Sequence, residues 1–339
     1  MKIKTRFFLL SLFFLLTIKS LQAQDSAGPP DDTTYIRGSV DWVKNLPPSG
    51  KDQVKKGAGE KFIEFVFGKR NAPALSRPVA VLPETEEGTW ILDQENGIIF
   101  RFREGVGEMT HFKNKQYSSF KSLVGICSLP GNRILFTDSY WNKLFVFTPG
   151  KKDLHPLNDS LELERPTGVA YSPVTGNIWV VETSVHRVTI LGGDGRVVKR
   201  FGTRGTGHGE FNYPTSVWID RSGKAYIVDA LNFRVQIFDA QGNFISMFGK
   251  PGDVTGSFAR PRGIATDSYG HVYVADALFN AVQIFDQAGR FLYTFGSQGH
   301  GEGEFWMPSG LFIDEADNIY VADSYNARVQ VFKLNYGNR

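Results

Sequence analysis

Short runs of Val, Ile, Phe and Tyr recur along most of the chain, separated by Gly, Asp, Asn and Pro. One such series is KAYIVD, RVQIF and FISMFG, at residues 224–229, 234–238 and 244–249. Runs of about five β-branched and aromatic residues between turn-forming residues are typical of strands joined by tight turns. No window keeps the apolar spacing of an amphipathic helix. The pattern therefore predicts an all-β protein.

The strand pattern also repeats with a fixed period. Successive spacings between equivalent acidic residues are 45, 44, 47, 47 and 47, and these residues are Asp93, Asp138, Glu182, Asp229, Asp276 and Asp323. Each unit contains four short strands, and strands such as YIVD are apolar on both faces. Four strands per unit at this period are typical of a propeller blade, which buries both faces only by stacking on its neighbours. The sequence predicts a six-bladed β-propeller of four-stranded blades.

The last unit, built from residues 309–332, ends after its third strand. The missing pattern, F-x-x-x-F-G, is found near the beginning of the chain as FIEFVFG at residues 62–68. We expect this N-terminal strand to complete the last blade, because a closed ring leaves no open sheet edge.

The segment GEGEFWMPSGLFIDEADNIYVADSYNARVQVF, at residues 301–332, resembles the NHL repeat. The resemblance covers about residues 60–332, and it is strongest in repeats three to six. It implies a six-bladed propeller that usually binds a ligand or partner, but a fold alone does not define an activity.

The beginning of the chain has the pattern of an export signal. A basic stretch is followed by an apolar run, Phe7–Leu16, and by a small-residue cleavage motif after Ala23. Four basic residues and no acid lie in residues 1–23, so the net charge falls from +3 to 3 − 4 = −1 on cleavage. We expect an exported protein, periplasmic or extracellular, with no membrane span and no nucleic-acid partner.

The remaining boundaries follow from composition. Residues 24–59 are rich in Pro, Gly and charge, which predicts an extended leader with one short strand at YIRGSV, residues 35–40. Residues 60–334 are assigned to the propeller and residues 335–339 to a C-terminal tail.

The loop GHGEF at residues 207–211, which recurs in longer form at 299–305, suggests two kinds of site. A phosphate-binding glycine loop should open a helix, but a strand follows here. A metal site would need His208 and His300 to converge, although they lie in connectors of different blades. We therefore predict structural connectors, with no metal, cofactor or catalytic residue. The repeated Asp-x-x-Asn-x-Arg pattern, as in Asp229 to Arg234, predicts an internal ion pair in each blade, and His186 occupies the same loop in repeat three.

The residue before the first proline of each inner strand should lie at one mouth of the central channel. These residues are Arg77, Arg165, Tyr213, Arg260 and Met307, with Ser122 in the unit that lacks the proline. Gluconolactonase-type propellers place a Glu at such an entrance, and peptidyl-hydroxyglycine lyases place histidines around the axis. Neither residue type is present at these positions, which argues against both enzymes.

The three arginines of this set lie on alternate blades, where they would suit a carboxylate or sulfate. Alternatively, each pairs with an acid of a neighbouring blade, such as Glu162, Glu164 or Asp229.

Aromatic side chains mark the loops between the second and third strands, which should lie on the same face. They are Tyr140, Trp141, Phe233, Phe279 and Tyr325. Large aromatics on loops of a rigid scaffold favour a binding surface, although they can also cover the end of a core. The sequence predicts an exported binding or scaffolding module for a protein, peptide, glycan or small anionic ligand. The alternative is a channel-type propeller enzyme, either a metal-dependent lactonase or hydrolase or a lyase.

Overall fold

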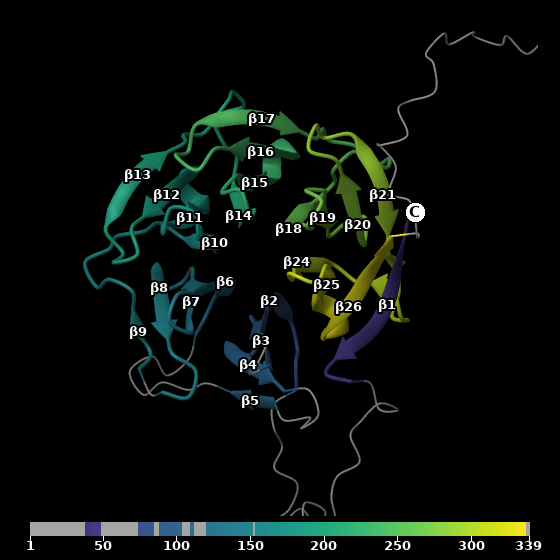
Figure 1. Cartoon of the computed structure of the whole chain (residues 1–339), viewed down its shortest axis with the longest axis horizontal. Helices are drawn as coiled ribbons and strands as arrows, with labels where there is room; N and C mark the ends of the chain where they lie inside the picture. Colours follow the sequence, from purple (N-terminus) through teal and green to yellow (C-terminus); the bar gives the residue numbers. More distant parts are fainter. Residues whose placement is uncertain are drawn as a thin grey trace, which may run out of the picture. The chain divides into compact units, whose positions relative to one another are not determined.

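Six four-stranded antiparallel sheets form a closed ring in the computed structural model, which describes residues 38–48, 74–84, 88–103, 109–111, 120–151 and 153–336 (Figure 1). The first strand of each blade lies beside the central axis and the fourth lies at the periphery (Figure 1). The predicted six-bladed propeller of four-stranded blades is confirmed.

The first three blades follow the chain from the centre outward. Blade 1 contains β2 (Pro78–Glu84), β3 (Gly88–Asp93), β4 (Ile98–Phe102) and β5 (Met109–His111). Blade 2 contains β6 (Leu123–Leu129), β7 (Arg133–Asp138), β8 (Lys143–Phe147) and β9 (His155–Pro156). Blade 3 contains β10 (Pro166–Tyr171), β11 (Ile178–Glu182), β12 (Arg187–Leu191) and β13 (Val197–Phe201).

The last three blades have the same order. Blade 4 contains β14 (Pro214–Ile219), β15 (Ala225–Asp229), β16 (Arg234–Phe238) and β17 (Phe244–Phe248). Blade 5 contains β18 (Pro261–Thr266), β19 (Val272–Asp276), β20 (Ala281–Phe285) and β21 (Phe291–Phe295). Blade 6 contains β24 (Pro308–Ile313), β25 (Asn318–Asp323), β26 (Arg328–Tyr336) and β1 (Gly38–Leu46).

Two kinds of short element lie between the longer strands. A single turn of 3-10 helix joins the second and third strands in three blades: η1 (Thr183–Val185), η2 (Ala230–Asn232) and η3 (Ser324–Asn326). A two-residue parallel pair, β22 (Ser297–Gln298) with β23 (Glu304–Phe305), lies in the connector between blades 5 and 6.

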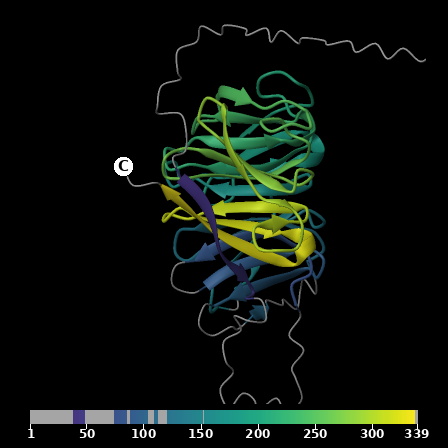
Figure 2. The same cartoon turned by 90° about the vertical axis from the view of Figure 1, so that its right-hand side faces the viewer.

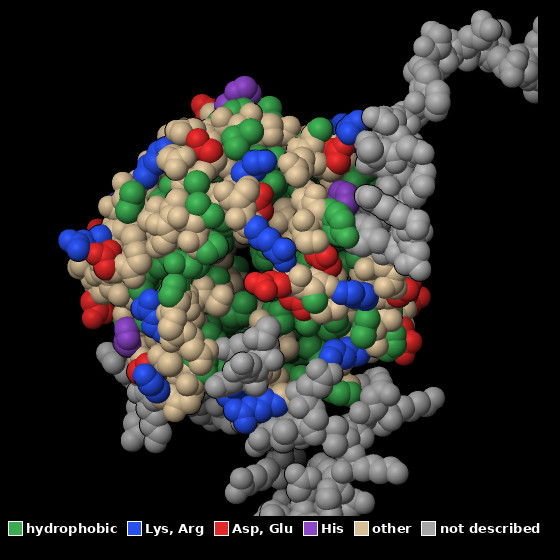
Figure 3. Space-filling view, viewed as in Figure 1, with side chains coloured by type: hydrophobic (Ala, Val, Ile, Leu, Met, Phe, Trp, Pro, Cys, Tyr) green, Lys and Arg blue, Asp and Glu red, His purple; other side chains and the backbone are tan. Residues whose placement is uncertain are grey.

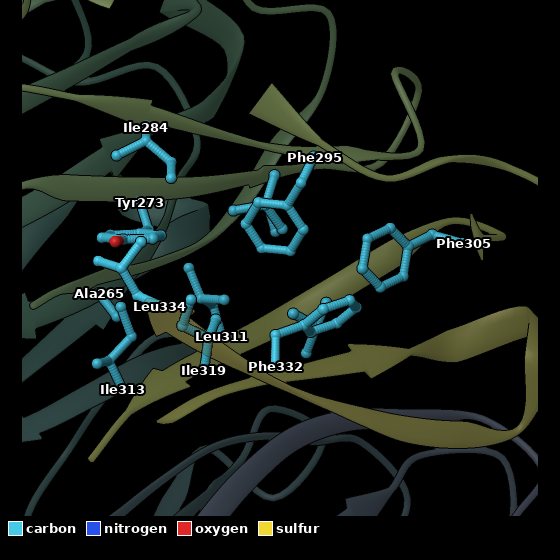
Figure 4. Close-up of a cluster of buried hydrophobic side chains, with 13 residues drawn as sticks. Ala265, Tyr273, Ile284, Phe295, Phe305, Leu311, Ile313, Ile319, Phe332 and Leu334 are labelled. Atoms are coloured by element: carbon cyan, nitrogen blue, oxygen red, sulfur yellow. The ribbon is translucent and has the colours of Figure 1, made fainter. Parts of the chain in front are cut away.

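The hydrophobic core lies between blades, where the apolar faces of adjacent sheets meet. Phe305, which comes from the connector before blade 6, is fully buried and faces Phe295 of blade 5 and Phe332 of blade 6 (Figure 4). Phe211 and Phe258 occupy the same position at the two preceding interfaces. Burying a phenylalanine side chain contributes about 1.5–3 kcal/mol, so each connector phenylalanine helps to hold two blades together.

The loop GHGEF therefore supplies one of these buried phenylalanines. A Cβ on Gly202, which has a φ of +101°, would lie 2.7 Å from the Phe211 ring. The Glu210 carboxylate accepts a hydrogen bond from the Gly207 N–H at 2.8 Å, and the His208 ring stacks on Phe244 at 4.2 Å. Both polar side chains are thus engaged within the connector and its own blade.

An ion pair anchors this connector to blade 4. The Asp229 carboxylate accepts hydrogen bonds from Arg234 at 2.7 Å and Asn232 at 2.8 Å. The remaining Arg234 N–H groups donate to carbonyls of the connector, including those of Thr206 and Glu210. This is the internal ion pair expected from the Asp-x-x-Asn-x-Arg pattern.

The strand that closes the ring differs from the predicted one. Gly38–Leu46 pairs antiparallel with β26, from Gly38 opposite Tyr336 to Leu46 opposite Val329 (Figure 2). Closure by an N-terminal strand is confirmed, but the predicted segment, residues 62–68, was the wrong one and lies outside the described residues. The outer strand of blade 6 needs alternating apolar side chains. Val40 and Trp42 pack on the core between blades 5 and 6, and Leu46 belongs to the core between blades 6 and 1.

This strand lies inside residues 24–59, which composition assigned to an extended leader, and it overlaps the short strand predicted at residues 35–40. The predicted signal peptide, residues 1–23, and the boundary at residues 59 and 60 lie outside the described residues and stay predictions.

Candidate functional site

The six inner strands surround a central channel of about 1040 Å³. Figure 3 shows this channel as a hollow at the centre of the ring, with basic and acidic side chains beside it. We call the end where the inner strands begin the entrance end, and the end where their hairpin turns lie the turn end.

Small residues let the inner strands approach one another around the channel. A Cβ on Gly168 would lie 2.7 Å from the Cα of Ser216, and one on Gly263 would lie 2.2 Å from the carbonyl oxygen of Ser309. Only glycine permits such close backbone contact. The close approach gives the channel a fixed wall made largely of backbone.

At the turn end, the described acidic residues of the channel lining are Asp220, Asp267, Asp314 and Glu315. The three aspartates hold their own turns. Asp220, for example, accepts hydrogen bonds from the N–H groups of Ser222 and Lys224 and from the Tyr226 hydroxyl, at 2.9 to 3.1 Å. These carboxylates are therefore committed to local structure.

At the entrance end, hydroxyl groups link neighbouring blades. In blade 3, the hydroxyls of Thr167 and Thr183 lie 2.7 Å apart, and Thr183 donates to the carbonyl of Pro214 in blade 4 at 2.6 Å. In blade 6, Ser309 and Ser324 lie 2.7 Å apart, and Ser324 donates to the Pro78 carbonyl of blade 1 at 2.7 Å. We call this arrangement the hydroxyl relay.

In blades 1 and 2, only the hydrogen bond to the next blade is present. Gln94 donates to the Leu123 carbonyl of blade 2 at 3.1 Å, and Ser139 donates to the Pro166 carbonyl of blade 3 at 2.5 Å. At the entrance end, the side chain that follows the second strand therefore joins four of the six pairs of neighbouring blades, those that begin at blades 1, 2, 3 and 6.

The relay is interrupted in blades 4 and 5, where Ala230 and Ala277 occupy the position of Thr183 and Ser324. The Thr215 hydroxyl of blade 4 is buried and has no hydrogen-bond partner among the described residues. At the same position in blade 5 stands Arg262, which lines the channel and makes no hydrogen bond or ion pair within the described part of the chain.

The environment of Arg262 opposes its charge. Burial and the positive charge of Arg260 lower the pKa of Arg262, and Tyr325 acts in the opposite direction. A guanidinium nevertheless stays protonated in proteins. The entrance end thus contains a partly buried cation without a counter-ion among the described residues.

The three arginines predicted for this mouth are not equivalent. Arg165 lines the channel and is exposed. Arg77 pairs with Glu95 of its own blade at 3.1 Å, and Arg260 is exposed but does not line the channel. Arg262, two residues after Arg260, was not predicted. Alternation along β18 was the available signal, because Arg262, Ile264 and Thr266 are spaced two apart and all line the channel.

Tyr213 and Met307, the other predicted entrance residues, cap the junctions between blades. Each has a positive φ, 50° and 55°, as does Arg165 with 52°. The Tyr213 N–H donates to Nδ1 of His186 at 3.0 Å, and the Met307 N–H donates to Oδ1 of Asn280 at 2.8 Å. Asn142 accepts from the Arg165 N–H in the same way. His186 therefore substitutes for an asparagine at one of three equivalent junctions.

The predicted aromatic residues fall into two groups. Tyr140 and Tyr325 are 57% and 53% exposed, and Trp141 packs against Tyr140 with ring centroids 5.3 Å apart. Trp306, which the sequence analysis missed, lies 5.8 Å from Tyr325. We call Tyr140, Trp141, Trp306 and Tyr325 the aromatic rim.

Phe233 and Phe279 are only partly exposed. Phe233 packs against the core between blades 4 and 5, which agrees with the alternative that these aromatics cover the core.

Other reactive groups in the described residues have structural surroundings. Burial raises the pKa of the Cys127 thiol to about 12, so the thiol stays protonated and unreactive. No group of three or more His, Cys, Asp or Glu in the described part could hold a metal ion. Nor does any helix there have the length and apolar composition of a membrane span.

The chain is a six-bladed β-propeller. Residues 266–338 match the family model DUF5128, described as a 6-bladed beta-propeller. A comparison with curated protein sequences finds no match.

Similar solved structures include an auxiliary nutrient binding protein from Bacteroides thetaiotaomicron, with 14% identity and a TM-score of 0.62, over 77% of this chain and 70% of that one. Virginiamycin B lyase from Staphylococcus aureus has 15% identity and a TM-score of 0.56, over 77% and 98%. At these identities the likeness establishes the fold alone.

Proposed function

We propose that this protein is an exported ligand-binding module that binds its ligand at the entrance end of the channel. One observation carries the proposal: Arg165 and Arg262 both line the channel without an acidic partner among the described residues. The described carboxylates of the lining lie at the opposite end, where Asp220, Asp267 and Asp314 accept hydrogen bonds from their own turns. Concave sites with a few convergent polar groups on a rigid scaffold are typical of ligand binding.

The ligand is an anionic small molecule, or a peptide or glycan that carries an anionic group. Guanidinium groups suit carboxylate and sulfate because their N–H donors match two oxygens at once. The aromatic rim offers exposed contact area for the rest of such a ligand, and aromatic residues are enriched where binding energy is concentrated. The description of the Bacteroides structure as a nutrient-binding protein agrees with a binding role.

The test is binding of the purified protein to arrays of acidic and neutral oligosaccharides and peptides. We expect the R165Q/R262Q double variant to lose the acidic ligands, and the W141A/Y325A double variant to bind them more weakly. Arg77→Gln, at an arginine already paired with Glu95, and Tyr269→Ala, at an exposed aromatic of the turn end, are the matched controls. Unchanged binding by R165Q/R262Q contradicts the proposal.

A channel-type enzyme is the alternative left by the sequence, and elemental analysis distinguishes it. We expect less than one zinc or calcium ion per purified chain. A stoichiometric ion of either kind favours a metal-dependent hydrolase or lyase instead.

A further inference from the structure

We propose that the interrupted relay of blades 4 and 5 is a carboxylate subsite, in which Arg262 donates two parallel hydrogen bonds and Thr215 a third. This inference rests on the proposed binding function and names the chemistry that the site recognises. Its ligand is a monocarboxylate attached to a ring.

The first argument comes from comparing equivalent positions around the ring. The residue after the first residue of each inner strand is Val79, Val124, Thr167, Thr215, Arg262 and Ser309 in blades 1 to 6. Three of these residues carry a hydroxyl. The hydroxyls of Thr167 and Ser309 are bonded inside the relay. The Thr215 hydroxyl has no partner in the described part of the chain, because residue 230 is alanine.

Such an unpartnered hydroxyl is unusual in a folded protein. Leaving a buried donor or acceptor unsatisfied costs about 1–3 kcal/mol, and most buried polar atoms have a partner. In blades 3 and 6 the partner is a second hydroxyl, that of Thr183 or Ser324. Thr215 lacks this second hydroxyl, and a ligand oxygen can take its place.

The second argument is the charge of Arg262. Thr215 and Arg262 stand at the same position on neighbouring inner strands, β14 and β18, and both line the channel. Arg260 adds a second positive charge close enough to disfavour the buried cation. A partly buried charge needs a counter-ion, but the described acids of the channel lining all lie at the other end, where the three aspartates among them are hydrogen-bonded to turns.

The number and shape of the donors favour a carboxylate. A guanidinium presents two parallel N–H groups to the two oxygens of a carboxylate. The Thr215 hydroxyl can then donate to a further lone pair on one of the two carboxylate oxygens.

The surroundings of Arg262 indicate what the carboxylate is attached to. Blade 6 lies directly beside Arg262, because a Cβ on the adjacent Gly263 would lie 2.2 Å from the Ser309 carbonyl oxygen. Tyr325 of this blade favours the charged form of Arg262. The Tyr325 ring lies 5.8 Å from that of Trp306. Both rings are exposed, by 53% and 42%. A ligand held by Arg262 would therefore present its remaining atoms to this aromatic pair, which suits a flat ring.

Titration of the full chain with benzoate and with its uncharged analogue benzamide tests the subsite, by calorimetry or by side-chain NMR signals of the arginines. We expect saturable binding of benzoate and at least tenfold weaker binding of benzamide. Arg262→Gln should weaken benzoate binding at least tenfold, as expected when a charged hydrogen-bond donor is lost. Thr215→Val should weaken it about threefold to tenfold, and Thr215→Ser should restore it.

Three controls separate the subsite from a change of fold. Arg77→Gln removes a paired arginine outside the channel lining, and Thr167→Val removes a hydroxyl of the intact relay in blade 3. Neither should change benzoate binding. Each variant is checked for an unchanged circular dichroism spectrum, so that weaker binding reports the lost contact.

Equal binding of benzoate and benzamide, or undiminished benzoate binding by Arg262→Gln, overturns the subsite. If sulfate binds more tightly than benzoate with the same dependence on Arg262, the carboxylate assignment is wrong. If array ligands depend on the aromatic rim while benzoate does not bind, the proposed function stands and the subsite does not. The reverse result, benzoate binding through Arg262 with no array ligand, supports the subsite and contradicts recognition through the rim.

Discussion

Blades 3 and 6 share a four-stranded antiparallel sheet with blades 4 and 5, but the two pairs differ where the inner strands enter the channel. In blades 3 and 6, two hydroxyls bond to each other and then to the next blade. In blades 4 and 5, Ala230 and Ala277 remove the second hydroxyl, and a threonine hydroxyl and an arginine are left without partners among the described residues. A repeat can thus lose one internal contact and gain a polar position that faces a cavity.

Away from the channel, the buried ion pairs of blades 3 and 4 should contribute equally to the free energy of unfolding. Asp229 of blade 4 and Glu182 of blade 3 are both fully buried and paired with arginine. Replacing either by alanine should lower the free energy of unfolding by about 3–5 kcal/mol, because a buried or partly buried arginine loses the carboxylate that balances its charge. Urea denaturation of Asp229→Ala and Glu182→Ala measures both values. A much smaller loss for Asp229→Ala than for Glu182→Ala would mean that blade 4 is less stable than blade 3 throughout. The two blades would then differ in more than the residues at the channel.

A middle-sized effect is expected from breaking an intact relay. Thr183→Val leaves the Thr167 hydroxyl and the Pro214 carbonyl without their side-chain partner, while the volume is nearly unchanged. We expect a loss of about 1–3 kcal/mol in the free energy of unfolding. Urea denaturation at neutral pH checks it, and a loss near zero would show that the relay adds nothing to stability.

The junction between blades 3 and 4 should respond to pH. Burial and then Arg204 lower the pKa of His186, while Asp229 opposes them. The neutral ring accepts the Tyr213 N–H at Nδ1, so the folded state favours the neutral form. The stability contributed by the neutral ring is present above the unfolded pKa of about 6.5 and is lost as the pH falls through the lower folded pKa.

The matched variant is His186→Asn, because Asn142 and Asn280 make the same contact without titrating. Urea denaturation between pH 7.5 and pH 5 should show a smaller change in stability for the variant than for the wild type. Equal pH dependence in the two proteins would exclude His186 as the titrating group.

The smallest effect should come from the interrupted relay itself. Thr215→Val removes a buried hydroxyl that has no partner among the described residues, so we expect no loss in the free energy of unfolding and a gain of up to about 1 kcal/mol, in contrast to Thr183→Val. Differential scanning calorimetry resolves a shift of this size. A loss as large as that of Thr183→Val would show that Thr215 has a structural partner, such as a bound water.

The sequence allowed the ring to be predicted because its period, turn residues and connector phenylalanines repeat. The closing strand was harder, because an outer strand needs only alternating apolar residues, and both 38–46 and 62–68 offer them. The closing pair is set by packing of Trp42 and Leu46 on neighbouring cores, which no local pattern reports.

The site was predictable only in part. The prolines placed Arg165 correctly at the channel mouth, whereas Arg262 was missed, although alternation along β18 offered a signal for it. The missing partner of Thr215 is evident only once residue 230 is placed beside it, which requires the register of β14 against β15.

Closure by β1 also sets an order of events during folding. Asn335 of β26 donates a hydrogen bond to Asp41 of β1 at 2.5 Å across 294 positions of sequence, and Ser324 reaches Pro78 across 246. Contacts between such distant segments form late, because the entropy of closing a long loop must be overcome first. Until they form, blades 1 and 6 expose unpaired edges that invite association with other chains. The channel mouth is therefore among the last parts of the molecule to acquire its shape, and a chain that has not yet joined its two distant strands has no site to offer a ligand.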